Sequence, residues 1–105
     1  MSTVVVNVKH ARNFDVYIGR VNETYGLPES PFANPFRVGR DGTREDVIDQ
    51  YREHLLARPD LLAALPGLCG KRLGCWCATP LMPELTAHDL PYRCHGQVVA
   101  ELADA

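Results

Sequence analysis

Val4-Val5-Val6-Asn7-Val8 is an almost continuous run of β-branched residues. Such a run predicts a strand that is covered on both faces, as strands are in the sheets of α/β proteins. Asp15 to Arg20 predicts a second, shorter strand with a glycine near its end. Another buried strand is expected at Leu73-Gly74-Cys75-Trp76-Cys77, a short apolar run that follows a basic pair.

Helix signals lie between and after these strands. Thr43 is expected to begin a helix, because its hydroxyl can accept from backbone N–H groups while Asp46 answers from the third helical position. Apolar residues then recur on one stripe of this helix, which ends before Pro59. The stripe consists of Val47, Ile48, Tyr51, Leu55 and Leu56.

Three weaker signals complete the pattern. Asp60 is expected to cap a short helix that Pro66-Gly67 terminates. The prolines of 79–91 indicate a loop, with a helical turn expected around Glu84. Gly96 to Ala103 predicts a closing helix, because its apolar residues have helical spacing.

The order strand, strand, helix, strand, helix predicts a small α/β sandwich, with helices packed on a short, mostly parallel sheet. At 105 residues the chain can bury one core, so residues 1–105 are expected to form a single domain. Hydrophobic residues make up 46% and charged residues 23%, which is typical of a globular protein. A core this small is often supplemented by a metal ion or a disulfide.

Charge and N-terminal sequence argue against several classes of function. The net charge is −2, so nucleic-acid binding is not indicated by the overall field. The first residues contain neither a basic segment followed by a long apolar run nor a cleavage site, so a cytoplasmic protein without membrane insertion is expected. In a reducing compartment, cysteines are expected to be metal ligands, reactive groups or core residues more often than they form disulfides.

The C-terminal third carries a cluster of such residues. On a strand, Cys75 and Cys77 would point to the same side, with Trp76 on the other. Cys94 and His95 come just before the last helix, where the helix dipole favours a thiolate. Together these four residues predict a tetrahedral zinc site.

Alternatives to this ligand set remain open. Cys69 and His88 are rival fourth ligands, and four cysteines also allow an iron–sulfur cluster or buried thiols without an ion. A redox pair competes as well, although C-x-C is not the thioredoxin spacing. If His95 does not bind the metal, its imidazole is available for chemistry.

The long loop between Val21 and Gly42 suggests a second kind of site. Arg20 follows the second predicted strand, Asn34 lies in the loop, and Arg44 falls in the first helical turn. Because α/β sheets bind ligands at the carboxyl ends of their strands, these residues and His95 predict an anion pocket. The competing interpretation is that the arginines are solvated and Asn34 only makes a turn.

Several short elements together resemble a bacterial and phage family catalogued as domain of unknown function 4326. The elements are Tyr17-Ile18-Gly19-Arg20, Asn34-Pro35-Phe36, Tyr51 in its helix, Gly70-Lys71, Leu73, Cys75-Trp76-Cys77 and Cys94-His95-Gly96. The resemblance implies that the Cys-Trp-Cys and Cys-His-Gly elements act together, and that Arg20 and Asn34 belong to the same site. Cys69 has no counterpart in that pattern.

This chain departs from the family pattern at two places. Sixteen residues, Ala78 to Arg93, separate the two cysteine elements, where family members usually have only a handful. Phe32-Ala33 stands where a Trp-Gly pair is common. The family name supplies no activity.

Two functions follow from these signals. The first is an enzyme or sensor that binds a nucleotide-like or other anionic small molecule beside the zinc. The H-x-E and P-C-x-x-C signature of zinc deaminases is absent, so deamination is not predicted. The second is a non-catalytic zinc module that binds a protein or nucleic acid, for example a phage effector.

Overall fold

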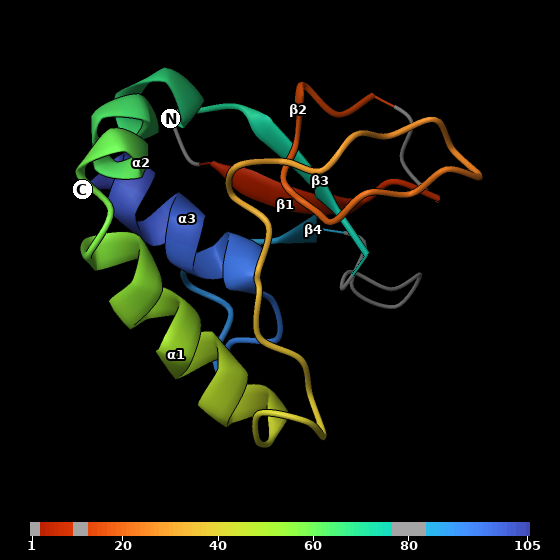
Figure 1. Ribbon diagram of the computed structural model, residues 1–105. Helices are drawn as coiled ribbons and strands as arrows, with labels where there is room; N and C mark the ends of the chain where they lie inside the picture. Colours follow the sequence, from red (N-terminus) through yellow and green to blue (C-terminus); the bar gives the residue numbers. More distant parts are fainter. Residues whose placement is uncertain (1–2, 10–12, 77–83) are drawn as a thin grey trace.

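Four short strands form one mixed sheet in the computed structural model, which describes residues 3–9, 13–76 and 84–105 (Figure 1). The strands β1 (Val4–Asn7), β2 (Val16–Tyr17), β3 (Arg72–Cys75) and β4 (Glu84–Leu85) lie in the order β2-β3-β1-β4. β3 pairs in parallel with both β1 and β2, whereas β4 is antiparallel to β1. The prediction of a short, mostly parallel sheet is therefore confirmed.

Three strand predictions need correction. The strand expected over 73–77 is β3, which begins at Arg72, and Trp76 lies in a bend after it. β2 is shorter than the predicted segment of Asp15 to Arg20, because the chain bends at Gly19, where the Tyr17 hydroxyl donates to the Arg20 carbonyl. The helical turn expected around Glu84 is instead strand β4. It satisfies backbone groups at the outer edge of β1, which would otherwise stay unpaired.

Helix α1 (Arg44–Leu56) begins as predicted. The Thr43 hydroxyl accepts from the Asp46 N–H at 3.1 Å, and the Asp46 carboxylate accepts from the Thr43 N–H at 2.9 Å. Four of the five stripe residues are buried, namely Val47, Ile48, Tyr51 and Leu55. Leu56 is 51% exposed, so the stripe prediction is wrong there, because one further residue is a turn of about 100° away from Leu55.

The second helical region differs from the prediction at both ends. α2 (Pro59–Ala64) starts with proline at its first position, and Asp60 does not cap it but pairs with Arg58. Pro66-Gly67 does not end the helical path, which continues as the 3₁₀ helix η1 (Leu65–Leu68). Proline is compatible with the first turn of a helix, since the N–H that it lacks has no partner there.

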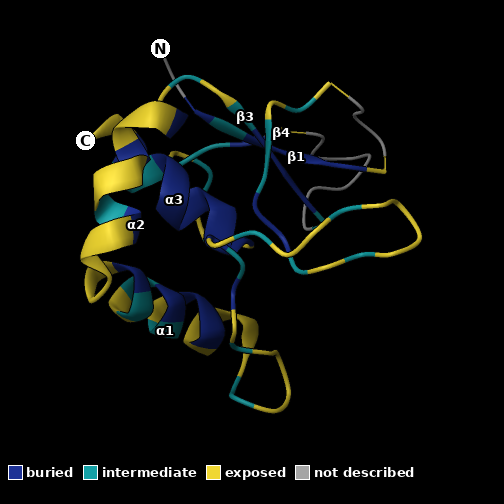
Figure 2. Ribbon diagram, turned by 45° about the horizontal axis from the view of Figure 1, so that its top comes forward, coloured by how far each residue is buried: buried dark blue, intermediate teal, exposed yellow. Residues whose placement is uncertain are grey.

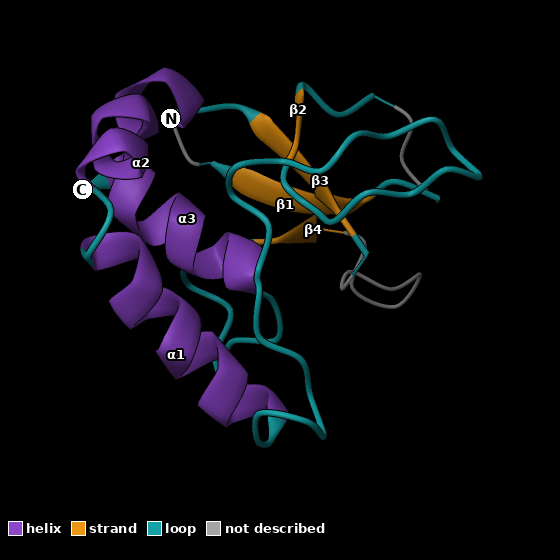
Figure 3. Ribbon diagram, in the orientation of Figure 1, coloured by secondary structure: helices purple, strands orange, loops and turns teal. Residues whose placement is uncertain are grey.

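All helices lie on one side of the sheet (Figures 1 and 3). α3 (His95–Asp104) packs against β1 and η1, and α1 packs against α3. Their inward sides and the strands are buried, while the outer sides of α1 and α2 are exposed (Figure 2). Helices packed on a short sheet confirm the predicted α/β class.

No helix in the described parts of the chain is long and apolar enough to cross a membrane.

Gly96 allows α3 to approach the sheet closely. A Cβ atom at this position would lie 2.8 Å from Ile18 Cδ1 and 2.9 Å from Val5 Cγ2. Real Cβ atoms do not make contacts this short, so any other residue here would force Ile18, Val5 or the first turn of α3 to shift.

A polar network joins α3 to α1. Arg52 in α1 donates two hydrogen bonds to the Glu101 carboxylate in α3, at 2.7 and 2.9 Å. The Tyr92 hydroxyl donates to the same carboxylate at 2.7 Å. These bonds, led by the Arg52 guanidinium, lower the pKa of Glu101 from 4.5 to about 2.

We expect Gly96→Ala to destabilise the protein by about 1–3 kcal/mol, because the new methyl group overpacks the contact with Val5 and Ile18. Chemical denaturation measures the effect. Gly67→Ala is the matched control, since no atom lies within 4 Å of the Cβ that it would add. Equal stability of the two variants would contradict the close contact.

The lowered pKa of Glu101 predicts a pH-dependent contribution to stability. The contribution is present above about pH 4.5 and is lost as the pH falls towards about 2, where the folded carboxylate is protonated. Glu101→Gln should cost about 1 kcal/mol at neutral pH, since solvent screens this half-exposed pair. Denaturation curves at several pH values should show the difference from wild type shrinking in acid. The control Glu53→Gln alters an exposed carboxylate of α1.

Candidate functional site

Two distant segments of the chain meet at the carboxyl end of the parallel strands. Cys75 is the last residue of β3 and pairs in register with Asn7, the last residue of β1. Cys94 and His95 begin α3, which the close contact at Gly96 seats against the sheet. The cluster therefore lies where the sheet was expected to bind ligands.

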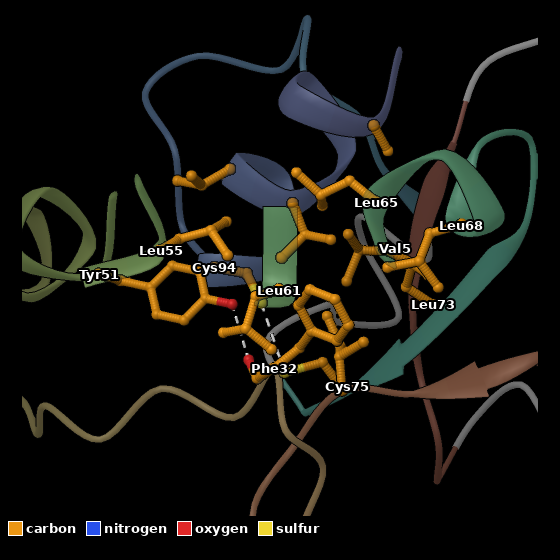
Figure 4. Close-up of a cluster of buried hydrophobic side chains, with 14 of the residues drawn as sticks. Val5, Phe32, Tyr51, Leu55, Leu61, Leu65, Leu68, Leu73, Cys75 and Cys94 are labelled. Carbon is orange, nitrogen blue, oxygen red and sulfur yellow. Dashed lines mark hydrogen bonds between the residues drawn. The ribbon is translucent and has the colours of Figure 1, made fainter. Parts of the chain in front are cut away.

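The three side chains form a compact, buried cluster of potential metal ligands. The Sγ atoms of Cys75 and Cys94 are 3.4 Å apart, and His95 Nδ1 lies 3.9 Å and 3.8 Å from them. The sulfurs are too far apart for a disulfide, whose S–S bond is about 2.05 Å. Figure 4 shows Cys94 and Cys75 close together at one end of the core.

These distances are close to those of a metal site. With metal–sulfur bonds of about 2.3 Å and metal–nitrogen bonds of about 2.0 Å, a tetrahedral ion would hold its sulfurs about 3.8 Å apart and each sulfur about 3.5 Å from the nitrogen. The observed S–S distance is shorter and the S–N distances are longer than this, each by less than about 0.5 Å. The three donors lie within 4.8 Å of one another and so are close enough to hold a metal ion.

The second nitrogen of His95 orients its ring. His95 Nε2 lies 2.8 Å from the Ile18 carbonyl oxygen, which can only accept a hydrogen bond. Nε2 therefore carries the proton, and in the neutral ring the lone pair of Nδ1 faces the two sulfurs. A backbone carbonyl that orients a ligating histidine in this way is usual at metal sites.

Tyr51 packs against the imidazole ring of His95. Its ring meets His95 edge to face, with 4.9 Å between ring centroids. Its hydroxyl donates to the Phe32 carbonyl at 2.8 Å (Figure 4). Burial raises the pKa of Tyr51 far above its ordinary value, and the nearby Cys94 and Cys75 add to this effect. Tyr51 thus stays a neutral hydrogen-bond donor and packing partner.

The start of α3 fixes Cys94 in two ways. Cys94 is the N-cap residue, and its Sγ accepts from the Gly96 N–H at 3.3 Å. The fully buried Gln97 accepts from the N–H groups of Arg93 and Cys94, and its amide donates to two carbonyls of the preceding loop. The helix N-terminus favours a thiolate at this sulfur.

The cluster forms part of the wall of a pocket of about 410 Å³. Apolar and aromatic groups form another part, including Phe36, Trp76 and two residues of α1. Four arginines also line it, namely Arg20, Arg37, Arg44 and Arg93. The described lining residues include no carboxylate, so the pocket is strongly basic in a chain whose net charge is −2.

The arginines that line this pocket differ in the contacts that their side chains make. Arg20 donates to the carbonyls of Asn34 and Phe36, at 2.9 and 2.7 Å, and so anchors the loop that forms the pocket. Arg44 donates to the Arg93 carbonyl at 2.9 Å. Within the described residues, Arg37, Arg44 and Arg93 form no ion pair with a carboxylate.

The structure brings most of the predicted site residues together. Arg20, Asn34, Arg44 and His95 all line the pocket. Asn34 also makes a turn, since its side-chain oxygen accepts from the Phe36 N–H at 2.9 Å. Asn34 therefore makes a turn and lines the pocket, and its part in anion binding stays a prediction.

The remaining candidate ligands are not part of the described cluster. Cys69 is exposed beside Asp104, with 3.5 Å between its sulfur and the carboxylate. His88 is exposed after β4. Cys77 lies outside the described residues, so its role as a ligand stays a prediction.

Arg93 is a pocket residue that sequence reasoning missed. Its position directly before Cys94, at the start of a helix, was the available signal. Trp76, which the sequence places on the opposite side of the strand from Cys75, also lines the pocket. Trp76 Nε1 donates to the Tyr17 hydroxyl at 2.9 Å, and that hydroxyl donates to the Arg20 carbonyl, so Trp76 joins β3 to the turn that carries Arg20.

Comparison with known proteins gives one family and one relative without a described activity. The profile of the family described as "Domain of unknown function (DUF4326)" matches residues 6–105. An uncharacterised protein of Acanthamoeba polyphaga mimivirus, R718, is 37% identical over 93 residues, which cover 87% of this chain and 68% of that protein. No solved structure matches significantly. The chain belongs to the family of domain of unknown function 4326.

Proposed function

We propose that this protein binds a zinc ion through Cys75, Cys94 and His95, and binds or acts on a nucleotide-like anionic small molecule beside it. One observation carries the proposal: buried metal-type donors line the same pocket as Arg37, Arg44 and Arg93, which form no ion pair with a carboxylate among the described residues. A metal that served only to hold the fold would need no basic pocket beside it.

Zinc is favoured by the chemistry of the donors. Two thiolates and one imidazole suit zinc, which accepts mixed sulfur and nitrogen ligands in tetrahedral geometry. Basic side chains and a helix N-terminus both favour the thiolate form that metal binding requires. The predicted Cys77 would complete a closed, four-ligand site, whereas without it one position would be open to the pocket.

The arrangement of the arginines around the pocket favours an anionic ligand. Arg37, Arg44 and Arg93 belong to the loop, to the start of α1 and to the segment before α3, so they surround the pocket from separate elements. Guanidinium groups bind phosphate and carboxylate in fork geometry. The apolar wall beside them suits a ligand that has a ring as well as a charge.

The ion would supply Lewis acidity to a bound anion if one of its positions is open. The protein's own residues would orient that anion and neutralise its charge. The competing function is a non-catalytic zinc module that binds a protein or nucleic acid. Binding of an anionic small molecule distinguishes the two functions.

Purified wild-type protein should contain about one zinc ion per chain by elemental mass spectrometry. Cys75→Ser and Cys94→Ser should each lower zinc content and thermal stability, because each removes a thiolate from the cluster. Cys69→Ser is the control, because this thiol is exposed beside Asp104 and not part of the cluster. Protein prepared without chelators that contains no metal would rule out the zinc proposal.

Arg93→Gln should weaken binding of an anionic ligand by about tenfold, because it removes a charged hydrogen-bond donor from the pocket. Titration calorimetry with inorganic phosphate and the four common ribonucleoside 5′-monophosphates measures this. Arg93 is a cleaner target than Arg20, whose substitution also releases the Asn34 loop.

Arg72→Gln serves as the control for this experiment, since Arg72 lies at the opposite end of β3 from Cys75 and pairs with Glu84. It should leave anion affinity unchanged. If the wild-type protein binds none of these anions, the anion proposal is wrong and the non-catalytic zinc module becomes the favoured function.

A further inference from the structure

A second hollow adjoins the first pocket across the loop that Arg20 anchors. Its volume is about 430 Å³, and Arg20, Asn34 and Arg37 line both hollows. Phe36 lines the first and His54 lines the second, and their rings meet edge to face with 6.1 Å between centroids. A thin wall therefore separates two neighbouring spaces.

The second hollow is also basic. Arg40 and Arg58 line it together with the shared arginines, and Glu29 is the one carboxylate among its described lining residues. Arg40 and Arg58 pair with Asp41 and Asp60. These pairs are largely exposed, so they contribute little stability and can exchange for a stronger anion.

The positive charge of the chain is concentrated here. At least six of its 11 lysine and arginine residues line the two hollows, namely Arg20, Arg37, Arg40, Arg44, Arg58 and Arg93. One small anion cannot contact all of them, because they lie on both sides of the loop. The distribution fits a ligand whose charges are spread along its length.

The two hollows differ in what they can accept. The first combines arginines with Phe36, Trp76 and apolar residues of α1, which suits a base and its phosphate. The second has arginines, Ser30 and Asn34 but little apolar wall, which suits phosphate and sugar. Arg37, on the wall between them, can contact the group that joins the two parts.

We propose that the ligand is a phosphodiester-linked dinucleotide unit, with its 5′ nucleotide in the first pocket and its next phosphate in the second hollow. This inference rests on the proposed anion site and names its ligand class. Such a unit occurs as a free dinucleotide or as the 5′ end of a single strand.

The test compares three probes by titration calorimetry on the full, metal-loaded chain. The probes are the tightest-binding nucleoside 5′-monophosphate, the 5′-phosphorylated dinucleotide that begins with it, and a 5′-phosphorylated ten-nucleotide single strand that begins with that dinucleotide. The dinucleotide should bind wild type about tenfold or more tightly than the monophosphate, because the second phosphate gains contacts with arginine.

A double variant isolates the second hollow. Arg58→Gln with Asp60→Asn removes the guanidinium while leaving the net charge unchanged, and both residues are exposed. Combined with Arg40→Gln and Asp41→Asn, it should abolish the gain from the second phosphate but keep the affinity for the monophosphate. Lys71→Gln is the control, since it removes an exposed charge next to the start of β3, outside both hollows.

Each outcome decides the inference. A gain in wild type that the combined variant with all four substitutions loses supports the inference. A further gain with the longer strand identifies a strand end as the source, whereas equal affinity of the dinucleotide and the longer strand identifies a free dinucleotide. Equal binding of monophosphate and dinucleotide, or a gain that the variants retain, overturns this inference and leaves the proposed anion site standing. Failure of every anion to bind overturns both.

Discussion

The packing of α3 against β1 at Gly96 is the contact on which the site depends. The Ile18 side chain lies against Gly96, and the Ile18 carbonyl lies 2.8 Å from His95 Nε2. Ile18, the residue that follows β2, therefore sets both the distance of α3 from the sheet and the orientation of the His95 imidazole. Because Cys94 caps this helix, its sulfur is brought to the end of β3, where Cys75 lies. A side chain at position 96 would disturb all of these relations together.

The arginines and the sulfur cluster line the same pocket. Positive groups beside a cysteine, and the N-terminus of a helix such as α3, favour the thiolate form of its side chain. The loop is anchored by Arg20, and the turn that carries Arg20 is joined to Trp76 through Tyr17. The Tyr-Ile-Gly-Arg, Asn-Pro-Phe and Cys-His-Gly elements of this chain thus meet at one pocket, although their residues are far apart in the chain.

Features that depend on neighbouring residues could be read from the sequence. The Thr43 and Asp46 capping box involves residues three apart, and the buried stripe of α1 follows from helical geometry. Strand β1 was predicted because a β-branched run suits a strand covered on both faces. The residues Cys75, Cys94 and His95 were found as candidate ligands by their chemistry and by their positions beside predicted element ends.

Features that depend on contacts between distant segments required the structure. The distance between Cys75 and Cys94 follows from the register of β1 with β3 and from the seat of α3, neither of which a local pattern contains. β4 forms because the edge of β1 has backbone groups to satisfy, although 84–85 has no strong strand signal of its own. Arg93 and Arg37 meet in one pocket only after the loop has folded across the ends of the strands. Residue chemistry and short-range geometry are encoded locally, whereas which residues meet depends on how strands pair and helices pack over the whole chain.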